Sequence, residues 1–175
     1  MMLAGWSDAA VGTHAQDGRC RLGYIIGQMF STLRGPVHIL QWAYKFTRKH
    51  VESSLGGEIF ALREMWGHME MIREFYMALG HEKIGSYGLI DCDCLLPHLR
   101  TGRLGTEKFL TLHFRSILGA MEGGDLGDVE RIPGNENPAD GLTKAKSDLG
   151  AAISFSGNGY LSTGAFGTAA RCVAY

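Results

Sequence analysis

The spacing of the apolar residues changes near residue 53, and this change divides the chain into two kinds of structure. Before it, Leu22, Tyr24 and Ile26 alternate with their neighbours at the two-residue period of a β-strand. After it, apolar residues recur at steps of three and four, which predicts an amphipathic helix of about 24 residues. They are Leu55, Ile59, Leu62, Met65, Met69, Ile72, Tyr76 and Leu79. Ser53 and Ser54 supply its N-cap, and Gly80 supplies a left-handed stop.

Shorter segments of both kinds surround this helix. Strands are predicted at residues 3–7, 22–26, 37–46, 87–90 and 129–132, and further helices at 95–99, 107–121 and 138–144. The order βββαβαβα predicts an α/β (α+β) fold with a five-stranded mixed sheet flanked by helices, in which the first three strands are antiparallel. Residues 1–146 form this domain. Residues 147–175 are rich in Gly, Ala and Ser and predict a weakly ordered tail, with the last helix continuing to Ile153 as one alternative.

Composition excludes several classes of protein. The net charge of −1 provides no basic field, so any contact with nucleic acid must come from a local patch. Cys92-x-Cys94 lacks the second pair of ligands that a zinc site needs, and we expect free thiols in a reducing compartment. No apolar run approaches the roughly 20 residues of a membrane helix, and we expect no signal peptide at the start. We therefore expect a cytoplasmic or nuclear protein with no membrane partner.

Two acids occupy positions that suit metal binding. Asp8 stands at the end of the first predicted strand, where a carboxylate can hold a divalent ion or simply start a turn. Glu58 lies early in the long helix, and its i+4 and i+7 neighbours, Leu62 and Met65, place it on the face toward the sheet. An unpaired charge there is costly. The alternative for Glu58 is a favourable interaction with the helix dipole.

Further acids follow two later elements. Asp91 ends the fourth predicted strand, and Asp93 shares its face if that strand continues, so either could be a ligand. Asp140 is the third residue of a helix start formed by Asn137 and Pro138, which explains it equally well without catalysis. Four carboxylates gathered at one edge of a mixed sheet would repel unless cations neutralise them. The set therefore predicts two Mg²⁺ or Mn²⁺ ions, an arrangement suited to phosphodiester hydrolysis.

Five segments carry a resemblance to a known family. They read W-S-D-A at 6–9, D-G-R-C-R-L-G-Y at 17–24, S-S-L-G-G-E at 53–58, I-D-C-D-C-L-L-P-H-L at 90–99 and P-G-N-E-N-P-A-D-G-L-T-K at 133–144. In this order they resemble the ribonuclease H (RNase H) domain of Copia-type retrotransposon polyproteins. The resemblance implies an RNase H fold and catalytic acids at Asp8, Glu58, Asp91 and Asp140. Asp91 is favoured over Asp93 because leucines follow it four and eight residues later, as in the family.

The resemblance also implies an activity and its partners. These are two Mg²⁺ (or Mn²⁺) ions, cleavage of the RNA strand of an RNA–DNA hybrid, and a reverse transcriptase domain in the parent polyprotein. An inactive RNase H-like module that binds nucleic acid or a protein is the alternative. Two features depart from the family pattern. Gly56 and Gly57 stand where better helix formers are usual, and residues 134–136 replace the loop that carries a mobile histidine in cellular enzymes.

Basic residues and a helix start near Glu58 are candidates for binding the hybrid. The basic candidates are Arg19, Arg21, Lys45, Arg48 and Lys49, and the backbone at Ser53 and Ser54 would bind phosphate at the helix N-terminus. The alternative for the basic residues is an ordinary solvated surface.

Overall fold

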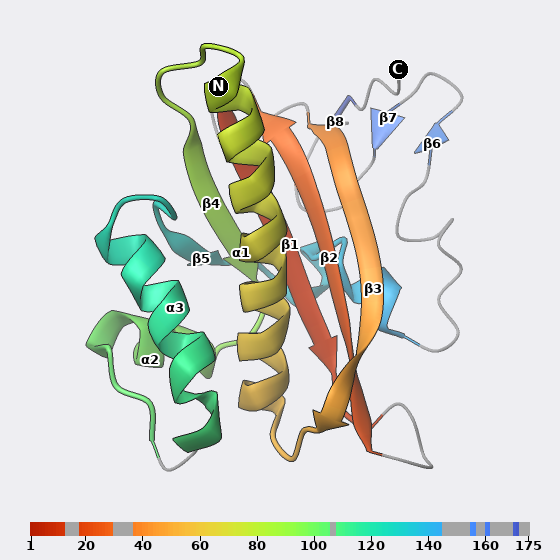
Figure 1. Ribbon diagram of the computed structural model, residues 1–175. Helices are drawn as coiled ribbons and strands as arrows, with labels where there is room; N and C mark the ends of the chain where they lie inside the picture. The colour runs from red at the N-terminus through yellow and green to blue at the C-terminus, as the bar shows by residue number, and fades with distance from the viewer. Residues whose placement is uncertain are drawn as a thin grey trace.

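Five strands form one mixed sheet in the order β3-β2-β1-β4-β5 (Figure 1). The computed structural model describes residues 1–12, 18–29, 37–105 and 108–144, together with residues 155–156, 160–161 and 170–171. The strands are β1 Met2–Ala10, β2 Arg19–Met29, β3 His38–His50, β4 Gly85–Ile90 and β5 Val129–Arg131. Strands β1 to β3 are antiparallel, whereas β4 runs parallel to both β1 and β5. The predicted five-stranded mixed sheet is confirmed.

The parallel pairing of β1 with β4 determines where the candidate acids meet. Trp6 of β1 lies opposite Leu89 of β4, so the two strands end at the same edge of the sheet. Asp8 lies near the C-terminal end of β1, and Asp91 directly follows β4. A helix that begins at this edge can add a third side chain to the pair.

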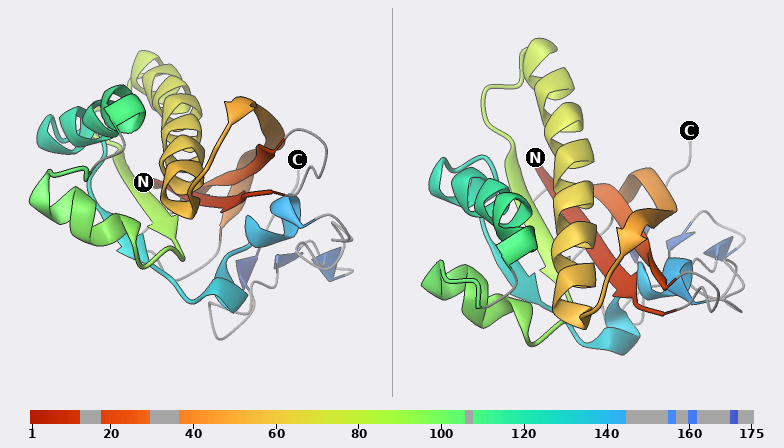
Figure 2. Two further views of the ribbon diagram at one scale, coloured as in Figure 1. Left: turned by 90° about the horizontal axis from the view of Figure 1, so that it is seen from below. Right: turned by 60° about the horizontal axis from the view of Figure 1, so that its bottom comes forward.

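Helix α1, Ser54–Ala78, is that helix, and it lies with α2 and α3 over one face of the sheet (Figure 2). Helix α2 spans Leu95–Thr101, and α3 spans Thr111–Glu122 after a short 3₁₀ turn, η1, at Lys108–Leu110. The main core between these helices and the sheet includes Ile26, Leu62 and Met65. A smaller core, formed by Trp6, Ile25 and Leu142 among others, separates the opposite face from α4, Asp140–Thr143.

Both ends of α1 follow the sequence prediction. Ser53 has extended backbone (φ −122°, ψ 150°), and its hydroxyl accepts a hydrogen bond of 2.9 Å from the Gly56 N–H. Gly80 has a φ of 93° after the last turn, a conformation that costs glycine little. The cap and the stop residue are confirmed.

Helix α4 is shorter than predicted. The 3₁₀ turn η2, Gly134–Glu136, precedes it, and Asn137 has extended backbone as expected before a proline. The helix therefore begins at Asp140 rather than at Pro138. The Asn137 side chain still caps this turn, because its Oδ1 accepts a hydrogen bond of 3.1 Å from the Ala139 N–H.

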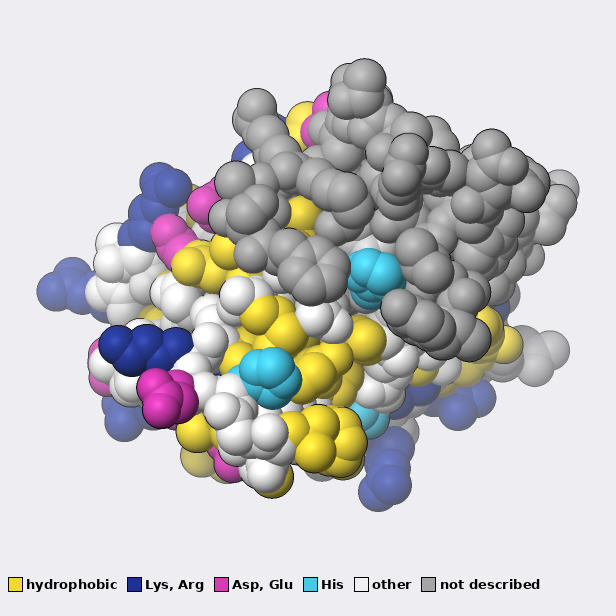
Figure 3. Space-filling view, turned by 90° about the horizontal axis from the view of Figure 1, so that it is seen from above, with side chains coloured by type: hydrophobic (Ala, Val, Ile, Leu, Met, Phe, Trp, Pro, Cys, Tyr) yellow, Lys and Arg dark blue, Asp and Glu magenta, His cyan; other side chains and the backbone are white. Residues whose placement is uncertain are grey.

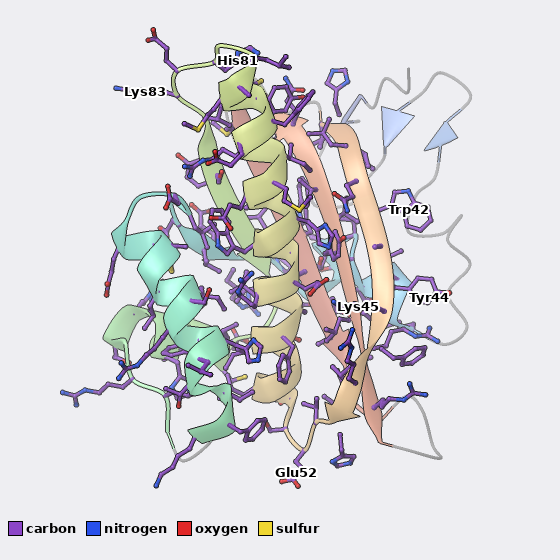
Figure 4. All side chains as sticks on the ribbon, in the orientation of Figure 1. Trp42, Tyr44, Lys45, Glu52, His81 and Lys83 are labelled. Atoms are coloured by element: carbon purple, nitrogen blue, oxygen red, sulfur yellow. The ribbon has the colours of Figure 1, made fainter. Side chains whose placement is uncertain are left out.

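Two surfaces expose large apolar side chains. At the far end of α1 these are Met71, Phe75, Met77 and Leu79, and Figure 3 shows apolar side chains gathered with histidines at that end of the molecule. On β3, Trp42 and Tyr44 point outward, whereas Lys45 lies on the side of α1 and pairs with Glu64 (Figure 4). No helix in the described part of the chain is both long and apolar enough to span a bilayer.

Little of the predicted tail is described. Strands β6 Phe155–Ser156, β7 Tyr160–Leu161 and β8 Ala170–Arg171 form a small antiparallel sheet. The other residues of 147–175, and the proposed continuation of the last helix, lie outside the described residues. The domain boundary at residue 146 stays a prediction.

Candidate active site

Three of the four predicted acids meet at the edge of the sheet where β1 and β4 end. One carboxylate oxygen each from Asp8, Glu58 and Asp91 lies within 4.8 Å of the others. Asp8 belongs to strand β1, Asp91 directly follows β4, and Glu58 lies in the second turn of α1. Three residues that are spread over more than 80 positions of the sequence thus form one cluster of carboxyl groups.

The cluster is largely withdrawn from water. Asp8 is 7% exposed and Glu58 is 6% exposed, while Asp91 is half-buried. Burial, and after it the charges of Asp8 and Asp91, raises the pKa of Glu58 from 4.5 to about 9. Burial also raises the pKa of Asp8 from 3.8 to about 6, against a hydrogen bond from Thr143, and raises the pKa of Asp91. Without cations, the site therefore favours protonated carboxyl groups.

Glycine at position 57 allows α1 to approach the sheet closely enough to place Glu58. A Cβ at Gly57 would lie 3.1 Å from side-chain atoms of Ala9, Val11 and Cys20, which is tighter than ordinary van der Waals contact. The glycine weakens the helix by about 1 kcal/mol relative to alanine. Because position 57 has no side chain, the first turns of α1 can pack directly against the ends of β1 and β2. The glycine at position 57 therefore has a packing reason.

Asp91 and Asp93 have different surroundings. The Asp93 carboxylate is exposed and binds Arg131 of β5 through both of its oxygens, one of them at 3.1 Å from the guanidinium. Asp91 instead faces the other acids and accepts a hydrogen bond from the side chain of Asn137. Gly134 passes close to it, since a Cβ there would lie 3.2 Å from Asp91 Oδ2. The geometry thus places Asp91, and not Asp93, in the cluster.

Asp140 lies at the margin of the cluster. It is the first residue of α4, and its carboxylate pairs with Lys144 one turn later. Its charge nevertheless raises the pKa values of Asp8 and Asp91, so it is near them. The hydrogen bond that Asp140 accepts from Lys144, followed by the charge of Asp140, raises the pKa of the lysine. The structure brings the fourth acid to the same edge without placing it among the three that share a possible ion site.

Two polar residues of the segment 133–144 support the acids, and sequence reasoning did not assign them to the site. Asn137 is 5% exposed and donates a hydrogen bond of 2.9 Å to the Ser7 carbonyl, besides its contacts with Ala139 and Asp91. Thr143 is 1% exposed, and its hydroxyl donates to Asp8 Oδ2. Their only signal in the sequence was their place beside Asp140 in a polar motif.

The chemistry of these donors fits a hard divalent cation. Three carboxylates supply oxygen ligands, which Mg²⁺ and Mn²⁺ prefer. Glu58 Oε2 is buried and has no hydrogen-bond partner among the residues that the structure describes, an expensive state for a carboxylate unless a cation or a proton neutralises it. Within the described residues, this is the one group of three or more His, Cys, Asp or Glu side chains close enough to share an ion.

The predicted nucleic-acid contacts come from strands β2 and β3 and from the start of α1. Ser53 and Ser54 begin that helix. The Arg21 guanidinium lies 5.5 Å from the centre of the Tyr44 ring and 5.0 Å from that of Phe46, and it donates a hydrogen bond to the Lys144 carbonyl. These contacts within the protein leave it less available to a ligand.

The remaining basic candidates lie nearby. Arg19 lies 5.7 Å above the Phe46 ring. Arg48 is exposed and lines a groove of about 870 Å³ with Lys45, Phe60, Phe109 and His113. The side chain of Lys49 is outside the described part of the structure.

Comparisons with known proteins connect this architecture to solved structures. No protein-family model matches the chain, and no curated protein matches its sequence. Among solved structures, LC11-RNase H1 isolated from compost is 15% identical with a TM-score of 0.62, over 86% of this chain and 98% of that one. The same enzyme in complex with an RNA/DNA hybrid is 12% identical with a TM-score of 0.57, over 77% and 88% of the two chains. RNase H1 from Halobacterium salinarum is 14% identical with a TM-score of 0.52, over 82% and 94%. The chain has the RNase H-like fold.

Proposed function

We propose that this chain is a metal-dependent endonuclease that cleaves the RNA strand of RNA–DNA hybrids. The observation that carries the proposal is the cluster of Asp8, Glu58 and Asp91, buried at the shared end of two parallel strands in an RNase H-like fold. A merely structural role would leave three carboxylates close together, with one buried oxygen lacking a partner. Such an arrangement is unfavourable unless cations compensate the charges or the groups take up protons, which itself costs stability at neutral pH.

Asp8, Glu58 and Asp91 would hold divalent ions, with Asp140 completing the set. Two bound ions would polarise the scissile phosphate and activate the attacking water. Thr143 holds Asp8 by a hydrogen bond, and Asn137 ties Asp91 to the Ser7 carbonyl on β1. These bonds orient the carboxylates, and metal ligands that are held in this way bind their ions more tightly.

The surface around the start of α1 would contact the hybrid. The N-terminus of α1, at Ser53 and Ser54, can attract a phosphate, because helix N-termini favour anions. Arg48 is exposed nearby, whereas Arg21 is held by Tyr44 and Phe46 and would contribute less. A solved neighbour with this fold was crystallised with an RNA/DNA hybrid, which supports the choice of substrate.

We also propose a retroelement origin for the domain. The five segments at 6–9, 17–24, 53–58, 90–99 and 133–144 resemble the RNase H domain of Copia-type polyproteins in their order. A reverse transcriptase domain would then be the natural partner within the parent polyprotein. Its product, an RNA–DNA hybrid, is the substrate that an RNase H requires.

A substrate panel tests the function. The protein is incubated with Mg²⁺ and end-labelled RNA–DNA hybrid, double-stranded RNA or double-stranded DNA, with EDTA as the metal-free control. Asp8→Asn, purified in parallel, controls for a contaminating host nuclease. We expect internal cuts in the RNA strand of the hybrid alone, none with EDTA, and none with Asp8→Asn. Folded wild-type protein that binds the hybrid without cutting it would instead indicate the inactive nucleic-acid-binding module.

A further inference from the structure

Two thiols lie side by side immediately after Asp91. Cys92 is half-buried and Cys94 is exposed, and their Sγ atoms are 2.8 Å apart. In a disulfide the two sulfurs are about 2.05 Å apart, so a small movement would bring them to bonding distance. The nuclease chemistry proposed above uses neither thiol.

A metal site does not explain the pair. Structural zinc needs four N or S ligands, and the group of His, Cys, Asp and Glu side chains that could share an ion within the described residues contains neither Cys92 nor Cys94. Cys20, the third cysteine there, is buried in a separate apolar cluster with Leu22, Val51 and Ala61. Two thiols without further ligands are suited to reversible oxidation instead.

We propose that Cys92 and Cys94 form a redox switch whose intrachain disulfide weakens divalent-ion binding at Asp91. The oxidant is a peroxide. The exposed Cys94 sulfur attacks one peroxide oxygen, the O–O bond breaks, and a sulfenic acid and one water form. The Cys92 sulfur then attacks the Cys94 sulfur, the S–O bond breaks, and a second water leaves with the thiol proton. Two thiols are thereby oxidised by two electrons as one peroxide is reduced to two waters.

The disulfide would reach the ion site through the segment between β4 and α2. Asp91 is held by the Asn137 side chain, and Asp93, the residue between the two cysteines, is held by Arg131. Closing a ring across Asp93 changes the backbone of that residue and pulls on both anchors. A disulfide strained in this way is also easily reduced by thiols, which makes the switch reversible.

The effect on cleavage rests on the proposed function, whereas disulfide formation and ion binding need no substrate. In a Cys172→Ser background, the folded protein is treated with hydrogen peroxide and then with dithiothreitol. Intact mass and alkylation mapping report the disulfide, calorimetric titration with Mn²⁺ reports ion binding, and hybrid cleavage is measured in parallel. Cys94→Ser, which cannot form the pair, is the matched control.

We expect a mass loss of two hydrogen atoms, protection of Cys92 and Cys94 from alkylation, and Mn²⁺ affinity lower by about 10- to 100-fold, the range seen when groups supporting a metal ligand are disturbed. Dithiothreitol reverses all three changes. Peroxide does not change the Mn²⁺ affinity of Cys94→Ser. The switch would be overturned if both thiols can still be alkylated after peroxide treatment. It would also be overturned if oxidation leaves the Mn²⁺ affinity unchanged, or if the reduced protein does not bind Mn²⁺. A reduced protein that binds Mn²⁺ but does not cleave the hybrid would refute the proposed function alone.

Discussion

Replacing Glu58 by glutamine should stabilise the protein when no divalent ion is present. Glu58 is 6% exposed, and its pKa rises from 4.5 to about 9 on folding because of burial and the charges of Asp8 and Asp91. The folded protein therefore takes up a proton that the unfolded chain does not hold at neutral pH. Stability from this group is complete below pH 4.5 and is lost as the pH rises toward about 9. Glutamine keeps the shape of the side chain and removes the titration.

The size of the effect follows from the two pKa values. Each pH unit above the unfolded pKa costs the folded state about 1.4 kcal/mol until the folded pKa is reached. At pH 7 the penalty is therefore roughly 3 kcal/mol, and at pH 5 it is below about 1 kcal/mol. A gain of that size at pH 7 raises the melting temperature by roughly 5–10 °C in a chain of this length.

Urea unfolding in EDTA, followed by tryptophan fluorescence, measures this difference. Trp6 and Trp66 are buried, so their emission reports loss of the core. Glu52→Gln is the matched control, because Glu52 is exposed in the segment before α1 (Figure 4). The reasoning is refuted if Glu58→Gln is no more stable than wild type at pH 7, or if its gain is the same at pH 5 and pH 7.

Three further results are expected. Mn²⁺ affinity, measured by calorimetry, should rise between pH 6 and pH 9, because the ion competes with protons on Asp8 and Glu58, whose pKa values are about 6 and about 9. Asn137→Ala should lower the free energy of unfolding by about 1–3 kcal/mol, since it leaves buried polar groups unpaired. The same substitution should weaken Mn²⁺ binding. If neither the free energy of unfolding nor the Mn²⁺ affinity changes, the role of Asn137 is contradicted. Ser53→Ala should cost about 1 kcal/mol in urea unfolding through loss of the cap, whereas Ser54→Ala, which removes no cap, should cost less.

The elements of the fold could be predicted where a long stretch of sequence repeats one period. Helix α1 follows the apolar spacing closely from its Ser53 cap to Gly80. The sequence pattern predicts the last helix too early, because Asn137 and Pro138 are good helix-start residues in isolation. In the structure Asn137 caps the turn from extended backbone, and its side chain also serves Ser7 and Asp91. Such long-range bonds leave no local pattern.

The site could be predicted as a set of acids but not as a geometry. The order of strands places Asp8 and Asp91 at one edge, and the helix face places Glu58 toward them. What could not be read from the sequence is how close α1 comes to the sheet. That distance depends on Gly57, whose missing side chain indicates, from the sequence alone, only a weaker helix. The sequence also gives no sign that Asp140 pairs with Lys144.

Cleavage by Asp91→Asn and Asp93→Asn tests the central claim most directly. Both variants remove one negative charge from the same four-residue segment, but Asp91 lies in the carboxylate cluster and Asp93 binds Arg131 at the surface. With Mg²⁺ and a labelled RNA–DNA hybrid, Asp91→Asn should lose the RNA cuts entirely while Asp93→Asn keeps a rate near that of wild type. Cleavage by folded Asp91→Asn at the wild-type rate would contradict the account.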